Sequence, residues 1–185
     1  MRTTLLIPER RLVLPDAADL ERNWLRPSRT AHAAITSSGF FRATFLDIFD
    51  TTQLAVDLDL ETHKGALFSD TVAPDFDADT AYGVAPYDAN EVVDSSGSEW
   101  PTGGVALVGT TFTGVATSYG KFDATDVSVA ATSLASAMGY LLYADALAGN
   151  NAIMLIDFVT AVTTVNGLFE ILWHSDGIWR NKLIP

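Results

Sequence analysis

Three closely spaced carboxylates make the first candidate for a chemical site. The segment Asp75-Phe-Asp-Ala-Asp79 has the spacing that opens an EF-hand calcium loop. That loop also needs a glycine at its sixth position and a glutamate at its twelfth, where this chain has Thr80 and Pro86. The EF-hand interpretation therefore fails. A looser calcium site with oxygen ligands stays as an alternative, because an ion would offset the clustered negative charge.

A second acidic group alternates along the chain. Asp57, Asp59 and Glu61 are two residues apart, which in an extended strand places their side chains on one face. Metal ligation is one interpretation of this face. The simpler one, which we adopt, is a solvated strand edge whose charges block unwanted pairing with other strands.

The residue types used most often in catalysis are scarce or isolated. There is no cysteine, so disulfides, thiol catalysis and cysteinyl zinc sites are excluded. His32, His63 and His174 stand apart, with no His-Glu-x-x-His spacing, and there is no Gly-x-Ser-x-Gly elbow. The pair Gly103-Gly104 has a hairpin context rather than that of a phosphate loop. We expect no cofactor and no enzymatic activity, and scattered carboxylates leave a glycoside hydrolase as an alternative.

Aromatic side chains mark the turn-rich stretch 69–104. Tyr82, Tyr87 and Trp100 lie there, beside several prolines and a Ser/Gly cluster. A sugar-binding platform uses such aromatic faces, and so do the anchors of protein interfaces. Loops longer than about 12–15 residues are uncommon unless they bind something. We therefore predict a protein-contact surface in this loop, with a carbohydrate-binding module as the alternative.

Charge is distributed unevenly along the chain, whose net charge is −12. Residues 1–42 hold seven arginines and four acids, residues 43–176 hold two lysines and nineteen acids, and residues 177–185 hold Arg180 and Lys182. Such an acidic body repels nucleic-acid phosphates and other copies of itself, whereas basic ends could bridge to an acidic neighbour. We predict an assembly subunit that does not bind nucleic acid.

The apolar runs are short. One of the longest, Ala152-Ile-Met-Leu-Ile156, is far below the roughly 20 residues that a membrane-spanning helix needs. We expect no membrane partner.

Residues 1–38 are predicted to form an extended arm, because prolines at 8, 15 and 27 interrupt any long element. A short helix is predicted over residues 17–25, capped by Asp16, with Leu20 and Trp24 on one face. We expect apolar arm residues to bury surface on a neighbouring subunit while arginines select an acidic partner. The candidates in the arm are Leu5, Leu6, Ile7, Arg10, Arg11, Leu20, Trp24, Arg26 and Arg29.

Residues 39–185 are predicted to form the body, with one helix near 39–50. Phe41, Phe45, Ile48 and Phe49 follow the i, i+4, i+7, i+8 spacing of an amphipathic helix, and Ser37 or Ser38 could cap it. We expect this stripe to pack on the body's own core. Residues 54–60 then alternate between apolar and polar, which predicts a half-buried strand.

The remainder of the body has the pattern of an all-β domain, with short apolar runs separated by turn residues. We predict a mainly β fold, an antiparallel β-sandwich of jelly-roll or Ig-like type, with one or two short N-terminal helices. Strands are expected over 64–68, 105–108, 111–116, 121–122 with 127–129, 138–143, 153–158, 167–173 and 178–183.

From Phe41 onward, the order of sequence pieces resembles a family of tailed-bacteriophage virion proteins, which are small β-rich structural subunits. The pieces that carry the resemblance are Leu58-Asp-Leu60, His63-Lys-Gly-Ala-Leu-Phe-Ser-Asp70, Asn90-Glu-Val-Val93, Thr102-Gly-Gly-Val-Ala-Leu107, Lys121-Phe-Asp-Ala-Thr-Asp-Val127, Gly139-Tyr-Leu-Leu-Tyr-Ala-Asp145, Ala152-Ile-Met-Leu-Ile-Asp-Phe158, Val165-Asn-Gly-Leu-Phe-Glu-Ile-Leu-Trp173 and Asp176-Gly-Ile178. The first forty residues have no counterpart, and the loop over 81–94 is longer than in the simplest members.

The resemblance implies a structural role in a virion, made in the host cytoplasm, with no catalytic residues to assign. We expect a capsid decoration or minor capsid subunit that contacts the major capsid protein and other copies of itself. A tail, connector or fibre-base component, contacting tail proteins, is the alternative within the same class.

Overall fold

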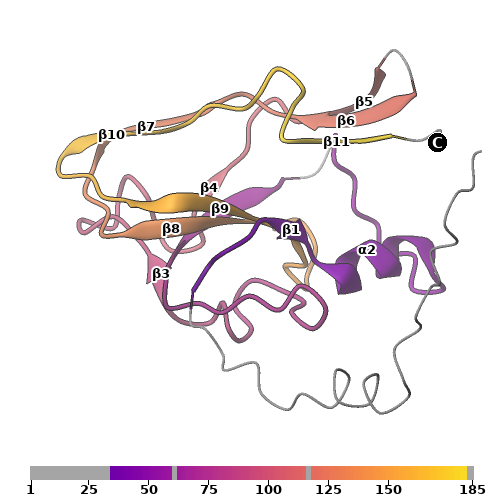
Figure 1. The fold of residues 1–185 in the computed structure, drawn as a ribbon, viewed down its shortest axis with the longest axis horizontal. Helices are drawn as coiled ribbons and strands as arrows, with labels where there is room; N and C mark the ends of the chain where they lie inside the picture. Colours follow the sequence, from indigo (N-terminus) through magenta and orange to yellow (C-terminus); the bar gives the residue numbers. More distant parts are fainter. Residues whose placement is uncertain (1–33, 60–61, 116–117, 183–185) are drawn as a thin grey trace, which may run out of the picture. The chain divides into compact units, whose positions relative to one another are not determined.

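The computed structural model describes residues 34–59, 62–115 and 118–182. These ranges contain eleven strands and one helix (Figure 1), and all the strand pairings are antiparallel. The prediction of a mainly β, antiparallel fold is confirmed. In chain order the elements are β1 (Gly39–Phe40), α2 (Arg42–Phe49), β2 (Lys64–Ser69), β3 (Glu91–Val92), β4 (Val105–Ala106), β5 (Thr111–Val115), β6 (Tyr119–Asp123), β7 (Val127–Thr132), β8 (Ala137–Tyr143), β9 (Ala152–Val162), β10 (Gly167–Ile171) and β11 (Trp179–Lys182).

The strands form three sheets. The largest has the order β1-β9-β8-β2-β3, with β4 also paired to β2. The smaller sheets have the orders β10-β7 and β11-β6-β5. Figure 1 shows β7 and β10 running alongside β8 and β9, and residues of these strands share one hydrophobic cluster. The two smaller sheets therefore help to cover one face of the large sheet.

The central strands β2 and β8 are apolar on both faces. Successive side chains of a strand point to opposite faces, so Tyr140 and Leu142 join one hydrophobic cluster while Leu141 and Tyr143 join another. The first cluster continues into the smaller sheets through residues such as Phe122 and Phe169. Both clusters exclude water from this sheet, which explains the uninterrupted apolar runs in the sequence.

The second face of the large sheet is covered by irregular chain. The stretch between β2 and β4 contains only the short strand β3 and an isolated bridge between Ala81 and Asn151. From this stretch, Val72 and Tyr87 are buried in the second cluster, together with Phe41 from the start of α2. This stretch therefore serves as a packed layer of the body.

The amino-terminal boundary of the body lies earlier than predicted. The Ile35 side chain is fully buried, and its backbone N–H donates to Asp70 Oδ1 at 3.1 Å. The Ser38 hydroxyl accepts a hydrogen bond from the backbone N–H of Asp157 at 2.9 Å. Residues 35–38 thus belong to the body rather than to the arm. The rest of the predicted arm, with the helix over 17–25, lies outside the described residues.

Most predicted strands are confirmed, with changes of a few residues at their ends, but the element predicted over 121–122 with 127–129 is two strands, β6 and β7, in different sheets. The strand predicted over residues 54–60 is wrong, because residues 54–59 form no strand. Leu54, Val56 and Leu58 are nevertheless half-buried, and the last two pack against the first cluster. An extended segment can alternate its side chains in this way without strand hydrogen bonds to a neighbour.

Close packing at Gly65 generates a test of the central sheet. Gly65 in β2 pairs with Leu142 in β8, and a Cβ at this position would overlap the buried ring of Tyr140. We expect Gly65→Ala to lower the free energy of unfolding by about 1–3 kcal/mol through overpacking, measured by urea denaturation. Gly114→Ala is the matched control, because nothing lies within 4 Å of a Cβ there. Equal denaturation midpoints for the two variants would contradict this packing.

Candidate functional site

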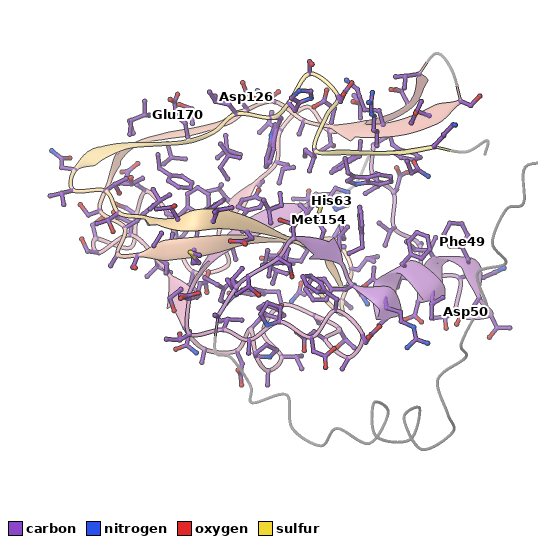
Figure 2. All side chains as sticks on the ribbon, in the orientation of Figure 1. Phe49, Asp50, His63, Asp126, Met154 and Glu170 are labelled. Atoms are coloured by element: carbon purple, nitrogen blue, oxygen red, sulfur yellow. The ribbon has the colours of Figure 1, made fainter. Side chains whose placement is uncertain are left out.

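An apolar groove opens between α2 and the three-stranded sheet. Its volume is about 810 Å³. Its walls come from β1, α2, residues 55–59, β5, β9 and β11. Figure 2 shows Phe49 near the end of α2, on the side of the helix that faces this space. We call this surface the α2 groove, and its large apolar side chains include Phe40, Phe45, Ile48, Phe49, Phe112 and Trp179.

The aromatic side chains of α2 are mostly exposed. Phe45 is 54% exposed and Phe49 is 75% exposed, with their ring centroids 5.3 Å apart. Of the predicted stripe only Phe41 is buried in the core. The expectation that the whole stripe packs on the body's own core is therefore wrong.

Phe45 and Phe49 are exposed because only the first turn of α2 is hydrogen-bonded to the large sheet. The backbone N–H of Phe41 donates to the Ile153 carbonyl at 3.1 Å, and the Thr44 hydroxyl donates to the Ala152 carbonyl at 2.6 Å. These bonds hold the first turn against β9. Phe41 is itself the N-cap and makes no side-chain cap bond, so the predicted serine cap is wrong. The later turn carries Phe45 and Phe49 beyond the core, into the groove wall.

Trp179 of β11 contacts aromatic side chains of both β1 and β5 in the groove. Its ring meets Phe40 edge-on at 5.1 Å between centroids, and it lies 5.4 Å from Phe112 and 6.3 Å from Phe122. Phe122 is fully buried. The groove therefore has an aromatic wall that is continuous with the core, and such a wall is preorganised for binding.

The charged side chains of the groove are Asp57, Asp59 and Arg180. The Asp59 carboxylate accepts from the backbone N–H of Phe112, and Asp57 Oδ1 accepts from the Asp59 N–H at 3.0 Å. Arg180 donates to Asp176 at 2.7 Å, outside the groove, and its guanidinium lies 4.9 Å from the Tyr119 ring centroid. The cation is thus already paired, and the groove presents acidic groups on one side of an apolar surface.

This geometry suits the binding of apolar side chains. Large exposed apolar patches rimmed by polar groups are typical of protein interaction surfaces and ligand grooves. The α2 groove has aromatic walls on several elements and carboxylates at one side. A peptide segment with a large apolar anchor and nearby cations matches both features.

Two of the three aromatic contact candidates in the long loop are core residues. Trp100 is 0% exposed and meets Phe169 edge-on at 5.1 Å, and Tyr87 is 2% exposed and packs against Phe41 and Phe68. The prediction that Trp100 and Tyr87 contact a partner is wrong, because both rings complete the packing on the large sheet. The same burial removes them as a sugar-binding platform.

Tyr82, the third candidate, is half-buried in a polar cluster. Its ring stacks on Tyr143 at 4.5 Å between centroids, and its hydroxyl donates to Glu91 Oε2 at 2.9 Å. The Gly103 N–H donates to Glu91 Oε1 at 2.7 Å, and the Tyr143 hydroxyl donates to the Gly103 carbonyl at 2.8 Å. These bonds tie three parts of the long loop to β8.

Burial controls the ionisation of this cluster. It raises the pKa of the Glu91 carboxyl, and the hydrogen bonds from Tyr82 and Gly103 oppose that rise in part. Burial, together with the hydrogen bond to Glu91, raises the pKa of Tyr82 to about 12. The tyrosine therefore stays protonated at neutral pH and serves as a donor.

The acidic segment at residues 75–79 folds on itself. Asp79 Oδ2 accepts from the backbone N–H of Asp75 at 2.8 Å, and Asp75 Oδ1 accepts from the Asp77 N–H at 3.0 Å. Within residues 34–59, 62–115 and 118–182, no group of three or more His, Asp or Glu side chains is placed to hold a metal ion.

The histidines are separate. His63 is fully buried, its Nε2 lies 3.0 Å from the Asp57 carbonyl oxygen, and its ring meets Phe122 edge-on. Figure 2 places His63 inside the fold. His174 is exposed and lies 3.6 Å from Asp176, whereas His32 lies outside the described residues.

The candidates in the arm cannot be placed, because Leu5, Leu6, Ile7, Arg10, Arg11, Leu20, Trp24, Arg26 and Arg29 all lie outside the described residues. Among the residues that are described, no helix is long and apolar enough to span a bilayer.

Comparison with known proteins identifies no relative. No protein-family model, curated protein or solved structure matches this chain. The proposals below therefore depend on its own residues and geometry, together with the resemblance described above.

The sequence predicts the apolar stripe of α2 but does not predict that it lines a groove. The spacing of Phe45, Ile48 and Phe49 is visible in the sequence, but it does not distinguish a buried stripe from an exposed one. Phe112 and Trp179 lie in predicted strands, and no sequence signal brings these strands next to α2. The helix of the structure has only eight residues, fewer than predicted, and so short a helix has few neighbours to cover its stripe.

The burial of Trp100 leads to a stability prediction. Trp100→Ala should lower the free energy of unfolding by about 3–5 kcal/mol, the usual cost of emptying a buried aromatic site. Val165→Ala is the control, since Val165 is 84% exposed and should change stability by less than about 0.5 kcal/mol. Guanidinium denaturation would measure both, and an unchanged midpoint for Trp100→Ala would refute the core assignment.

The raised pKa of Glu91 predicts a pH dependence of stability. The folded protein holds the Glu91 proton more tightly than the unfolded chain does, so protonation favours the folded state. This contribution is fully present below the unfolded pKa near 4.5 and is lost as the pH rises through the higher folded pKa. Stability relative to Glu91→Gln should therefore fall as the pH rises across that window.

Thermal or urea unfolding at a series of pH values would measure this difference. Glu99→Gln is the control, because Glu99 lies in the same loop with an exposed side chain, and it should alter the pH profile less. Wild-type stability that rises relative to that of Glu91→Gln as the pH increases would contradict the assignment.

Proposed function

We propose that this chain is a non-enzymatic structural component of a bacteriophage virion. Its role is that of a capsid decoration or minor capsid subunit that binds and stabilises the assembled shell. The proposal takes its class from the resemblance in the order of sequence pieces. The observation that carries it is the α2 groove, an open aromatic surface suited to holding a segment of another protein.

The charge of the body fits this role. Residues 34–185 hold nineteen acidic and five basic side chains, so free copies repel one another. Association then needs a short-range apolar contact with suitable geometry, such as the one the groove offers. A subunit that binds only assembled neighbours stabilises the assembly by mass action.

The proposal also includes the type of β fold. We retain an antiparallel β-sandwich of jelly-roll or Ig-like type as the architecture of the body. The shared hydrophobic cluster between β8 of the large sheet and β6, β7 and β10 of the smaller sheets supports two packed layers. A rigid body of this kind would display the groove in a constant orientation.

A tail, connector or fibre-base position is the alternative within the same class. It would use the same groove and the same charge distribution, so neither feature separates it from a capsid position. Immunogold labelling of intact particles, or a reconstruction of the particle, would distinguish the two by where the density lies.

The direct test is whether the chain is part of purified particles. We expect mass spectrometry of washed, DNA-filled particles to find it at a fixed copy number relative to the main shell protein. We also expect particles assembled without it to lose their DNA at a lower temperature. Absence of the chain from particles that are otherwise complete would overturn the proposal.

A further inference from the structure

We infer that the α2 groove receives residues 17–25 of a neighbouring copy of this chain, with Trp24 as the anchor. This inference deepens the proposed function and rests on it, because it names the contact by which adjacent subunits would be linked. The occupant is identified by its apolar side chains, its charge and the position at which it joins the body.

The apolar fit comes from the aromatic walls. Phe45 and Phe49 are the two most exposed large side chains of the groove, and Trp179 lies across from them on β11. Residues 17–25 supply Leu20, Trp24 and Leu25 within one short segment. Tryptophan is the residue most enriched at the energetic centres of protein interfaces, and a groove of about 810 Å³ has room for it and its neighbours.

The charges of the two surfaces are complementary. Residues 1–33 hold six arginines and four acids, in contrast to the strongly acidic residues 34–185. Arg22 and Arg26 lie within two residues of Trp24. Asp57 and Asp59 line the groove, and Arg180, the one cation among its described lining residues, is paired with Asp176. An occupant that brings arginines would complement the acidic side, and such charges favour correct encounter and register.

The course of the chain favours a neighbouring copy. Phe40 lines the groove, and the chain before it runs along the large sheet to Ile35, whose N–H is bound by Asp70 at the end of β2. Figure 1 shows this segment extending from β1 away from α2. Residues 35–38 therefore lead away from the groove of the same copy.

The length of the linker is sufficient for exchange. Nine residue steps separate Leu25 from Ala34, which span at most about 30 Å when extended. That distance reaches a second body packed against the first. Because each copy would give its segment to the next and receive one from another, the contact is heterologous and can close a ring or continue around a shell.

A complementation experiment tests the inference with full-length chains. Trp24→Asp removes the anchor and leaves the groove intact, whereas Phe49→Asp places a charge in the groove and leaves the segment intact. Leu172→Asp is the matched control, because Leu172 is 69% exposed and is not part of the groove. Circular dichroism establishes that each variant is folded, and sedimentation velocity measures association over a range of concentrations.

We expect the wild type and Leu172→Asp to associate equally. Each of the other two variants alone should associate at least about tenfold more weakly, the usual effect of losing an interface hot spot. An equimolar mixture of Trp24→Asp and Phe49→Asp should regain association, because one partner brings an intact groove and the other an intact segment. Should Phe49→Asp not fold, Phe45→Asp replaces it, since Phe45 is also exposed in the groove.

Three outcomes would overturn the inference. The first is a mixture that associates no better than either variant alone. The second is a wild type that stays monomeric throughout, which includes the case in which the segment occupies the groove of its own copy. The third is association that neither variant weakens.

Failure of the inference is distinguishable from failure of the proposed function. A chain that is present in purified particles but shows no complementation would overturn only the exchanged segment. A chain that complements in solution but is absent from particles would overturn the virion role and leave the contact between copies in place.

Discussion

The structure depends on the burial of both faces of one antiparallel sheet. In β2 and β8, neighbouring residues are apolar and point in opposite directions, so Tyr140 and Leu142 contribute to one hydrophobic cluster and Leu141 and Tyr143 to the other. A sheet of this composition cannot leave either face in water. Most of the remaining described chain therefore packs against one or the other face of this sheet.

The two covers are built differently. One consists largely of the smaller sheets, and its strands turn Phe122, Val127 and Phe169 inward. The other is made mostly of irregular chain between β2 and β4, which contributes Val72 and Tyr87. Within this irregular layer, the Glu91 carboxylate accepts hydrogen bonds from the Tyr82 hydroxyl and from the backbone N–H of Gly103. A long loop can therefore be a structural layer, and length alone does not make it a binding surface.

The α2 groove is an apolar surface that these covers leave open. The first turn of α2 is tied to β9 by Thr44, and the helix then continues past the core, leaving Phe45 and Phe49 exposed. Trp179 extends the aromatic core of the smaller sheet to the same surface. In a body with so much negative charge, an open aromatic surface next to carboxylates favours an apolar partner that carries cations. The basic character of residues 1–33 is the reason for proposing a second copy of the chain as that partner.

The sequence by itself determined the class of fold, most of the strands and the division of charge. Period-two alternation, short apolar runs and turn residues are local properties, so β5, β8 and β10 could be predicted from their own residues. An extended segment that pairs with no neighbouring strand has the same alternating sequence as a true strand. For this reason the prediction of a strand at residues 54–59 is wrong. Only the tertiary structure decided which aromatic side chains are buried and which are exposed. Trp100 lies in a polar loop but is buried, and Phe45 lies in an apolar stripe but is exposed. Burial depends on which distant elements pack over a side chain, and local spacing carries no information about those neighbours.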